Sequence, residues 1–201
     1  MEPWEPTLHL SELEAPLQWP AVFGNPNPVE VELGIGKGSL LRRTAAAAPD
    51  RNFVGVERAL KYLRIAAHRI ARDRQTNIRL VHTDAVYFVE KFVPDASVAA
   101  FHIYFSDPWP KKRHAKRRLF QPPFVRLLES RTAPQGRIHI RTDVDWYFED
   151  IVNLFARETH LETVENCTLA ADSMPPEMRT NYEAKYRAIG KIIFALTLRK
   201  S

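Results

Sequence analysis

The chain has 201 residues, of which 45% are hydrophobic and 26% are charged, a composition typical of one globular domain rather than of a disordered chain. Its single cysteine, Cys167, excludes an internal disulfide, and no apolar run approaches the roughly 20 residues that span a membrane. The net charge is +5. The first residues lack a signal-peptide pattern, which together with the single cysteine and the lack of a membrane span predicts a cytoplasmic protein. We also expect a monomer or a homodimer.

The first 28 residues contain six prolines and little periodicity, which predicts an irregular lead-in at 1–28 before a single domain at 29–201. After Pro28, short apolar strands alternate with helical segments. The predicted strands are 29–33, 53–57, 78–82, 98–105, 136–142, 161–166 and 191–199. The predicted helices are 40–48, 59–74, 84–91, 122–131 and 144–158.

This alternation predicts an α/β fold in which crossover connections build a mostly parallel sheet of seven strands, with helices on both faces. The seventh strand follows a loop, 167–182, rather than a helix, so we expect it to run antiparallel to the others. That loop is also long enough to suggest a function.

Three glycines, Gly34, Gly36 and Gly38, stand directly after the first strand and before the first helix. Glycine at this point lets the backbone turn tightly and approach a ligand closely. The spacing G-x-G-x-G is not that of a phosphate-binding P-loop, and it is one residue short of the dinucleotide pattern. A tight turn without a ligand is the alternative interpretation.

Acidic residues occur near the carboxyl ends of the first three strands. Glu57 could receive the two hydroxyls of a ribose, Asp84 could accept from an adenine amino group, and Glu32, buried in its strand, suits a ligand with positive charge. Glu57 and Asp84 could instead only cap the helices that follow them. Because the carboxyl ends of parallel strands share one edge, the three acids together favour S-adenosylmethionine, a cation without phosphate.

The fourth strand leads into Asp107-Pro108-Trp109-Pro110, a turn stiffened by two prolines. Its carboxylate could accept hydrogen bonds from the N1–H and N2–H of guanine while an aromatic ring stacks on the base. Alternatively, Trp109 only packs and Asp107 only shapes the turn.

Residues 111–118 read KKRHAKRR and carry six positive charges, so the rest of the chain sums to 5 − 6 = −1. No acidic residue occurs between Pro108 and Leu128. A charge run is usually a solvated face, but this one adjoins the suspected active site and lacks balancing acids, which favours RNA phosphates. The seven histidines are scattered without a ligand motif, so no metal site is predicted.

From Val29 to the C-terminus the sequence resembles the bacterial tRNA (guanine-N7-)-methyltransferase family. The segments that carry the resemblance are VELGIGKGSLL, FVGVE, HTDA, SDPWPKKRHAKRRL, RTD at 141–143 and TNYE at 180–183, of which DPWPKKRHAKRR is the most specific. The resemblance implies a Rossmann-like class I methyltransferase fold, S-adenosylmethionine as the cofactor, and N7 of guanosine 46 in the tRNA variable loop as the target.

The resemblance also implies residue roles. Glu32, Glu57, Asp84 and Asp107 match cofactor-contacting acids, and Asp107 also matches the acid usually named catalytic. The implied substrate-binding residues are Lys111, Asp143, Thr180, Asn181, Tyr182 and Glu183. The implied RNA-binding residues are Arg113, His114, Lys116, Arg117 and Arg118.

The chain departs from the family pattern in three places. Ser106 stands where proline is expected, which predicts a less rigid turn, and Tyr182 stands where many members have phenylalanine. The lead-in is short, so an N-terminal RNA-contacting element could be missing.

Guanine N7 has a free lone pair, so the expected reaction is a direct in-line displacement whose main requirement is alignment, worth about 7–11 kcal/mol in favourable cases. Asp107 would oppose the positive charge that develops on the base rather than act as a general base. Two rival functions remain, a non-catalytic RNA-binding protein on the same sheet and a methyltransferase that modifies an amino group.

Overall fold

The structure, a computed structural model, describes residues 5–169 and 190–201. Its strands form a single sheet of eight. They are β1 (Thr7–Leu8), β2 (Val29–Leu33), β3 (Asn52–Glu57), β4 (Ile78–His82), β5 (Val98–Tyr104), β6 (Thr132–Thr142), β7 (Glu162–Leu169) and β8 (Ile193–Arg199).

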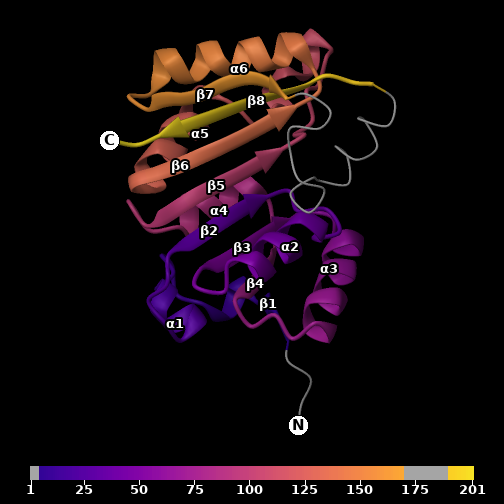
Figure 1. The fold of residues 1–201 in the computed structure, drawn as a ribbon, viewed down its shortest axis with the longest axis vertical. Helices are drawn as coiled ribbons and strands as arrows, with labels where there is room; N and C mark the ends of the chain where they lie inside the picture. Colours follow the sequence, from indigo (N-terminus) through magenta and orange to yellow (C-terminus); the bar gives the residue numbers. More distant parts are fainter. Residues whose placement is uncertain (1–4, 170–189) are drawn as a thin grey trace.

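The strand order is β1-β4-β3-β2-β5-β6-β8-β7 (Figure 1). All pairs from β1 to β6 are parallel, whereas β8 runs antiparallel to both β6 and β7. The predicted mostly parallel sheet with an antiparallel final strand is therefore confirmed. The eighth strand is β1, in which Thr7 and Leu8 pair with Leu80 and Val81, and two residues are too few to show a strand period.

Six α-helices occur in the described part of the chain, together with two short 3-10 helices at Leu10–Glu12 and Lys112–Arg117. The α-helices are α1 (Trp19–Phe23), α2 (Ser39–Ala47), α3 (Leu60–Arg72), α4 (Ala85–Lys91), α5 (Pro122–Arg131) and α6 (Asp145–Glu158). None of these described helices is both long and apolar enough to cross a membrane.

The sheet separates two hydrophobic cores. The larger core contains the buried faces of α4, α5 and α6, and the smaller one lies between α2, α3 and the strands β3 and β4. Val31 and Leu33 point into the larger core. Because side chains alternate along a strand, Glu30 and Glu32 point to the opposite face of β2. This alternation places Glu32 on the side of the sheet that α2 and α3 partly cover.

Candidate active site

The carboxyl ends of β4, β3, β2 and β5 meet at one edge of the sheet, and the chain reverses its direction of progression between β2 and β5. Two cavities of ≈ 370 and ≈ 650 Å³ open at this edge. Both are lined by Gly34, Glu57, Tyr104 and Phe105, so they are two parts of one crevice. Their volumes lie in the range of about 300–1,000 Å³ that is usual for small-ligand sites.

The glycine loop after β2 forms one wall of the smaller cavity. Gly34 and Gly36 have φ of 85° and 54°, and a Cβ added to either would meet no atom within 4 Å. The backbone there is open to a ligand. Gly38 has φ of 68°, but its added Cβ would lie 2.8 Å from Cβ of Ala66 on α3. Gly38 therefore permits the close packing of α3 against the loop.

Glu57, the last residue of β3, links the glycine loop to the start of α3. Its Oε2 accepts from the backbone N–H of Gly36 at 2.9 Å, and its Oε1 accepts from that of Ala59 at 2.7 Å. Each carboxylate oxygen has a second lone pair, so these bonds leave acceptor capacity for ribose hydroxyls. Glu57 can therefore hold the start of α3 and bind a ligand at the same time.

Asp84 caps α4 and also lines the larger cavity. Its Oδ1 accepts from the backbone N–H groups of Val86 at 2.9 Å and Tyr87 at 3.3 Å. The cap that the sequence allowed is thus present. Both bonds use Oδ1, which leaves Oδ2 as the atom that could receive an adenine amino group.

Glu32 lines the smaller cavity and is only 7% exposed. Burial raises the pKa of its carboxyl group to about 8, although the charges of Arg43 and Arg141 act in the opposite direction. A buried acid with this pKa is mostly neutral at pH 7. Its carboxylate form would be favoured by a cation in the cavity, which fits the ammonium or sulfonium charge of S-adenosylmethionine.

Asp107 lies on the larger cavity, exposed, in the turn that follows β5. Phe105 and Trp109 on either side of it have φ of 53° and 43°, a region that side chains larger than glycine rarely adopt. Oδ1 of Asp107 accepts from the backbone N–H of Trp109 at 3.2 Å. The turn therefore holds one carboxylate oxygen in place and presents the group to the crevice.

Ser106, which replaces the expected proline, connects this turn to α6. Its Oγ lies 3.4 Å from the hydroxyl oxygen of Tyr147. Tyr147 is buried, and burial raises the pKa of its hydroxyl. The contact supplies a tether to the turn that a proline could not make.

The basic segment 111–118 divides into two groups by its contacts. The Arg117 guanidinium lies 5.1 Å from the ring centre of Trp109, and the His114 ring meets that ring edge-on at 5.6 Å. Arg118 donates from Nε to the carbonyl oxygen of Pro108 at 3.0 Å and lies 4.8 Å from the ring of Trp146. Lys111, Lys112 and Lys116 are exposed without such a contact among the described residues, and the exposed Arg113 donates from Nε to Nε2 of the His114 ring at 3.3 Å.

The other expected substrate residues are distributed differently. Lys111 precedes the 3-10 helix beside the turn. Asp143 follows β6, and its Oδ2 accepts from Nζ of Lys191 at 2.5 Å. Residues 180–183 lie outside the described residues. Within the ranges 5–169 and 190–201, no group of three or more potential metal-binding side chains occurs.

Several residues of the crevice were not predicted. Tyr104 lines both cavities, with its hydroxyl 2.9 Å from Nδ1 of His102 and the Arg141 guanidinium 4.7 Å from its ring centre. Tyr62 of α3 lines the smaller cavity, and Arg58 lines the larger one. Tyr104 ends β5 just before the acidic turn, and that position could have identified it.

Comparisons with known proteins agree with this geometry. The sequence profile of a family described as "Putative methyltransferase" matches residues 26–196. A tRNA (guanine-N(7)-)-methyltransferase of Bordetella pertussis is 37% identical over 92% of this chain and 72% of its own. One of Listeria monocytogenes is 37% identical over 89% and 83%, and one of Cupriavidus pinatubonensis is 40% identical over 92% and 73%.

Solved structures share the fold at low sequence identity. The crystal structure of a 16S rRNA methyltransferase, KamB, superposes with a TM-score of 0.68 at 15% identity and covers 91% of this chain and 92% of its own. A 30S ribosomal A1408 methyltransferase from an uncultured bacterium gives 0.61 at 16%, over 90% and 91%. The Rossmann-like class I methyltransferase fold that the sequence predicted is confirmed.

Proposed function

This chain belongs to the tRNA (guanine-N(7)-)-methyltransferase family, and from that premise we propose that it methylates N7 of guanosine 46 in the variable loop of tRNA, with S-adenosylmethionine as the methyl donor. The observation that carries the proposal is the larger cavity, which brings together Asp84 for the cofactor, Asp107 for the base and Arg117 for the RNA. Because tRNA is the substrate, the proposed reaction takes place in the cytoplasm.

The cofactor would lie along the whole crevice. Bound there, it supplies a methyl group on a positively charged sulfur. Glu57 would receive the ribose hydroxyls and Asp84 the adenine amino group, while Gly34 and Gly36 let the backbone approach closely. Glu32 would neutralise the positive end of the ligand. The buried Glu32 would thus act through its charge, and the more accessible Glu57 and Asp84 would act through hydrogen bonds.

The methyl transfer is proposed to be a direct in-line displacement by guanine N7. N7 already carries a lone pair, so no side chain has to remove a proton before the attack. The protein's main task is alignment of the two reactants. Asp107, held by its bond to the Trp109 N–H, would stabilise the positive charge that the guanine acquires.

Replacement of Glu57 by alanine is expected to weaken S-adenosylmethionine binding by roughly 1.5–3 kcal/mol, the range for a hydrogen bond to a charged group. Titration calorimetry on the folded variant measures this change. Glu149→Ala is a matched control, because Glu149 is exposed on α6 and lies outside both parts of the crevice. Wild-type affinity in Glu57→Ala would contradict the assignment.

The exposed lysines of the basic segment are expected to contact tRNA phosphates. In Lys112→Ala with Lys116→Ala, the slope of log affinity against log salt should flatten by roughly 0.7–0.9 for each phosphate that is no longer neutralised, with cofactor affinity unchanged. Arg118→Ala is a poor test, because it also removes the bond to the Pro108 carbonyl. An unchanged slope would mean that the segment is a solvated face.

One assay separates the proposal from its rivals. Purified protein is incubated with bulk tRNA and radiolabelled S-adenosylmethionine, and the modified nucleoside is identified. N7-methylguanosine is the expected product. A methyl group on N2 would indicate an amino-methyltransferase, and tRNA binding without any transfer or cofactor binding would indicate a non-catalytic RNA-binding protein.

A further inference from the structure

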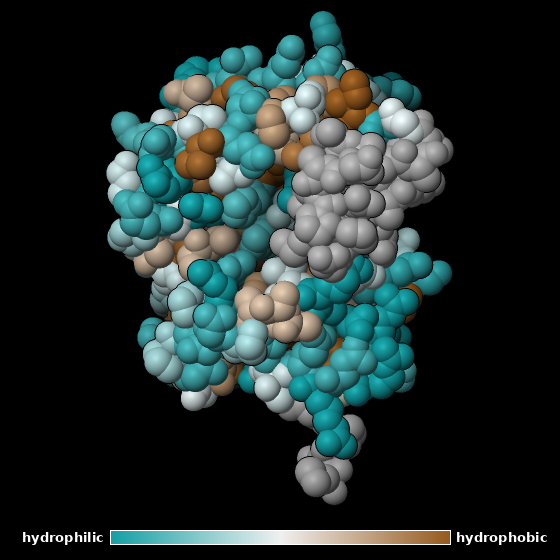
Figure 2. Space-filling model, viewed as in Figure 1, coloured by the Kyte–Doolittle hydropathy of each residue, from teal (hydrophilic) through white to brown (hydrophobic). Residues whose placement is uncertain are grey.

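Helix α3 carries a second concentration of positive charge, on the far side of the crevice from residues 111–118. Its 13 residues include no acid. Leu63, Ala66 and Ile70 are buried in the smaller core, so the polar residues of the helix face outward. The basic residues in and just before the helix are Arg58, Lys61, Arg64, His68, Arg69 and Arg72. Figure 2 shows a mostly hydrophilic surface over α3, at the lower right.

These basic side chains fall into a paired and an unpaired group. Arg69 donates to the carbonyl oxygen of Lys37 at 3.5 Å, and Arg72 pairs with Asp73 at 2.9 Å. Within the described part of the chain, no acidic partner occurs for the side chains of a second group, which we call the α3 ridge. The α3 ridge consists of Arg58, Lys61, Arg64 and His68, all exposed.

The members of the α3 ridge follow one another at intervals of three, three and four residues. Arg58 precedes α3, and the spacing along the helix keeps Lys61, Arg64 and His68 on one side. Further cations lie nearby, since burial and the charges of Arg69, Arg72 and Arg43 lower the pKa of Arg42 on α2, and Asp73 pairs with both Arg42 and Arg72. The like charges of Arg58, Lys61 and Arg64 repel one another in the free protein, and a bound polyanion would offset this repulsion.

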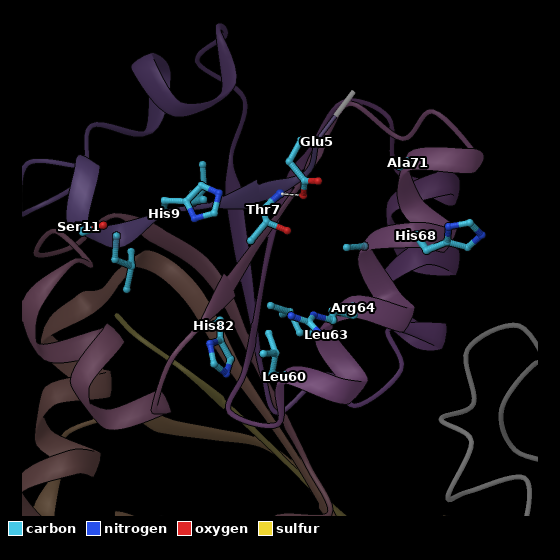
Figure 3. Close-up of a pocket in the computed structure, with 13 residues that line it drawn as sticks. Glu5, Thr7, His9, Ser11, Leu60, Leu63, Arg64, His68, Ala71 and His82 are labelled. Atoms are coloured by element: carbon cyan, nitrogen blue, oxygen red, sulfur yellow. Dashed lines mark hydrogen bonds between the residues drawn. The ribbon is translucent and has the colours of Figure 1, made fainter. Parts of the chain in front are cut away.

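A cleft of ≈ 780 Å³ adjoins the ridge, between α3 and the lead-in strand β1 (Figure 3). Its lining combines the apolar Leu60 and Leu63 with His9, Arg64 and His82, and the acid Glu5 lies at its lead-in end, where it accepts from the backbone N–H of Thr7. Arg64 and His68, one turn apart on α3, both line the cleft (Figure 3). Among the described residues that line it, no Trp, Tyr or Phe occurs, so this lining suits a sugar-phosphate backbone better than stacked bases.

The α3 ridge is continuous with the proposed active site. Arg58 at its start lines the larger cavity together with Arg117 and Asp107. The ridge and the basic segment 111–118 therefore approach the crevice from opposite sides. A nucleic acid whose reactive base enters the crevice can contact both at once.

We propose that the α3 ridge and its cleft are a second phosphate-binding surface, which holds a double-helical arm of the same tRNA that the basic segment holds near the target guanine. This inference rests on the proposed function. It assigns the ridge to backbone contacts, which position an RNA without reading its sequence. Its contribution is therefore to tRNA affinity and not to the chemical step.

The test is the double variant Lys61→Ala with Arg64→Ala. Its tRNA affinity is expected to fall at least about tenfold, the lower end of what hydrogen bonds to charged groups contribute. The slope of log affinity against log salt should flatten by roughly 1.4–1.8, because two phosphates are no longer neutralised. KM for tRNA should rise while kcat at saturating tRNA and the affinity for S-adenosylmethionine stay at wild-type values.

Two controls make the result specific. Lys91→Ala with Arg157→Ala removes the same charge from the ends of α4 and α6, at the edge of the sheet opposite the crevice, and should bind tRNA normally. Lys61→Arg with Arg64→Lys keeps the charge and should also bind normally. Weaker tRNA binding by either control would overturn the proposal, because the effect would not be specific to charge on the ridge.

The remaining outcomes separate this inference from the proposed function. If the ridge variant binds like wild type while Lys112→Ala with Lys116→Ala binds weakly, the second surface is refuted and the proposed function stands. If wild-type protein binds no tRNA at all, both are refuted. Equal decreases of tRNA and cofactor affinity in the ridge variant would show damage to the crevice and would also refute the second surface.

Discussion

Replacement of Asp107 by asparagine is expected to lower the single-turnover rate of methyl transfer by roughly 10- to 100-fold. The amide keeps the shape and can still accept from the Trp109 N–H, so the turn is preserved. The variant lacks the negative charge that opposes the cation developing on guanine. Removal of a single preorganised electrostatic group from a buried site costs about 10²–10³ in rate, and because Asp107 is exposed we expect a smaller loss than this.

Quenched single-turnover assays with saturating tRNA measure this rate, and calorimetry should show a much smaller change in cofactor affinity. Asp50→Asn is the matched control, since Asp50 is exposed in the connection between α2 and β3, at the opposite end of the sheet. A wild-type rate in Asp107→Asn would reduce Asp107 to a residue that shapes the turn.

The sheet was largely predictable because most of its strands are apolar or regularly alternating runs of five or more residues bounded by turns. The strand prediction was incomplete where the sequence shows only a weak strand pattern. Strand β1 has two residues, and β6 begins at Thr132, four residues before its predicted start. Pro134 and Gln135, with φ of 61°, interrupt the strand period there, and the pairing with β5 shifts register at the same place.

The convergence of Glu32, Glu57 and Asp84 followed from topology alone, because carboxyl ends of parallel strands share one edge. The different contacts that individual residues of the basic segment make could not be predicted from the sequence. Arg118 differs from its neighbours because Trp146 of α6 lies beside it, 28 residues away in the chain. Likewise, the smaller cavity acquires Tyr62 only when α3 packs on the glycine loop. The roles of Arg118 and Tyr62 depend on residues that are distant in the sequence, so a local sequence pattern does not predict them.

Glu30 and Glu32 illustrate the same limit within one strand. Both lie on the same face of β2 and are 8% and 7% exposed. Burial acts to raise the pKa of Glu30, but its bonds to His102 at 2.7 Å and Arg51 at 2.8 Å outweigh burial and lower it. Burial raises the pKa of Glu32 to about 8. Two acids with similar sequence context are thus a structural ion pair and a candidate ligand group.

The substitution Glu32→Gln is expected to weaken S-adenosylmethionine binding and to stabilise the free protein at alkaline pH. The folded-state pKa of about 8 lies above the ordinary value of 4.5. The stabilisation that protonated Glu32 gives the folded state is therefore complete below pH 4.5 and is lost as the pH rises through about 8. Glutamine does not titrate, so the free-energy advantage of the variant should grow across this window to the order of a few kcal/mol. Denaturant unfolding from about pH 5 to about pH 9 measures the difference.

Glu30→Gln, two residues away, should behave in the opposite way. The lowered pKa of Glu30 contributes stability above its ordinary pKa that is lost as pH falls, so its replacement should destabilise the protein at pH 7.

The binding of S-adenosylmethionine should also distinguish the two variants. Its positive charge favours the Glu32 carboxylate, so binding to wild type at pH 7 should release most of one proton, measured by calorimetry in buffers of different ionisation enthalpy. Glu30→Gln should retain that release and Glu32→Gln should lose it. Proton release that persists in Glu32→Gln would place the cation of the cofactor elsewhere.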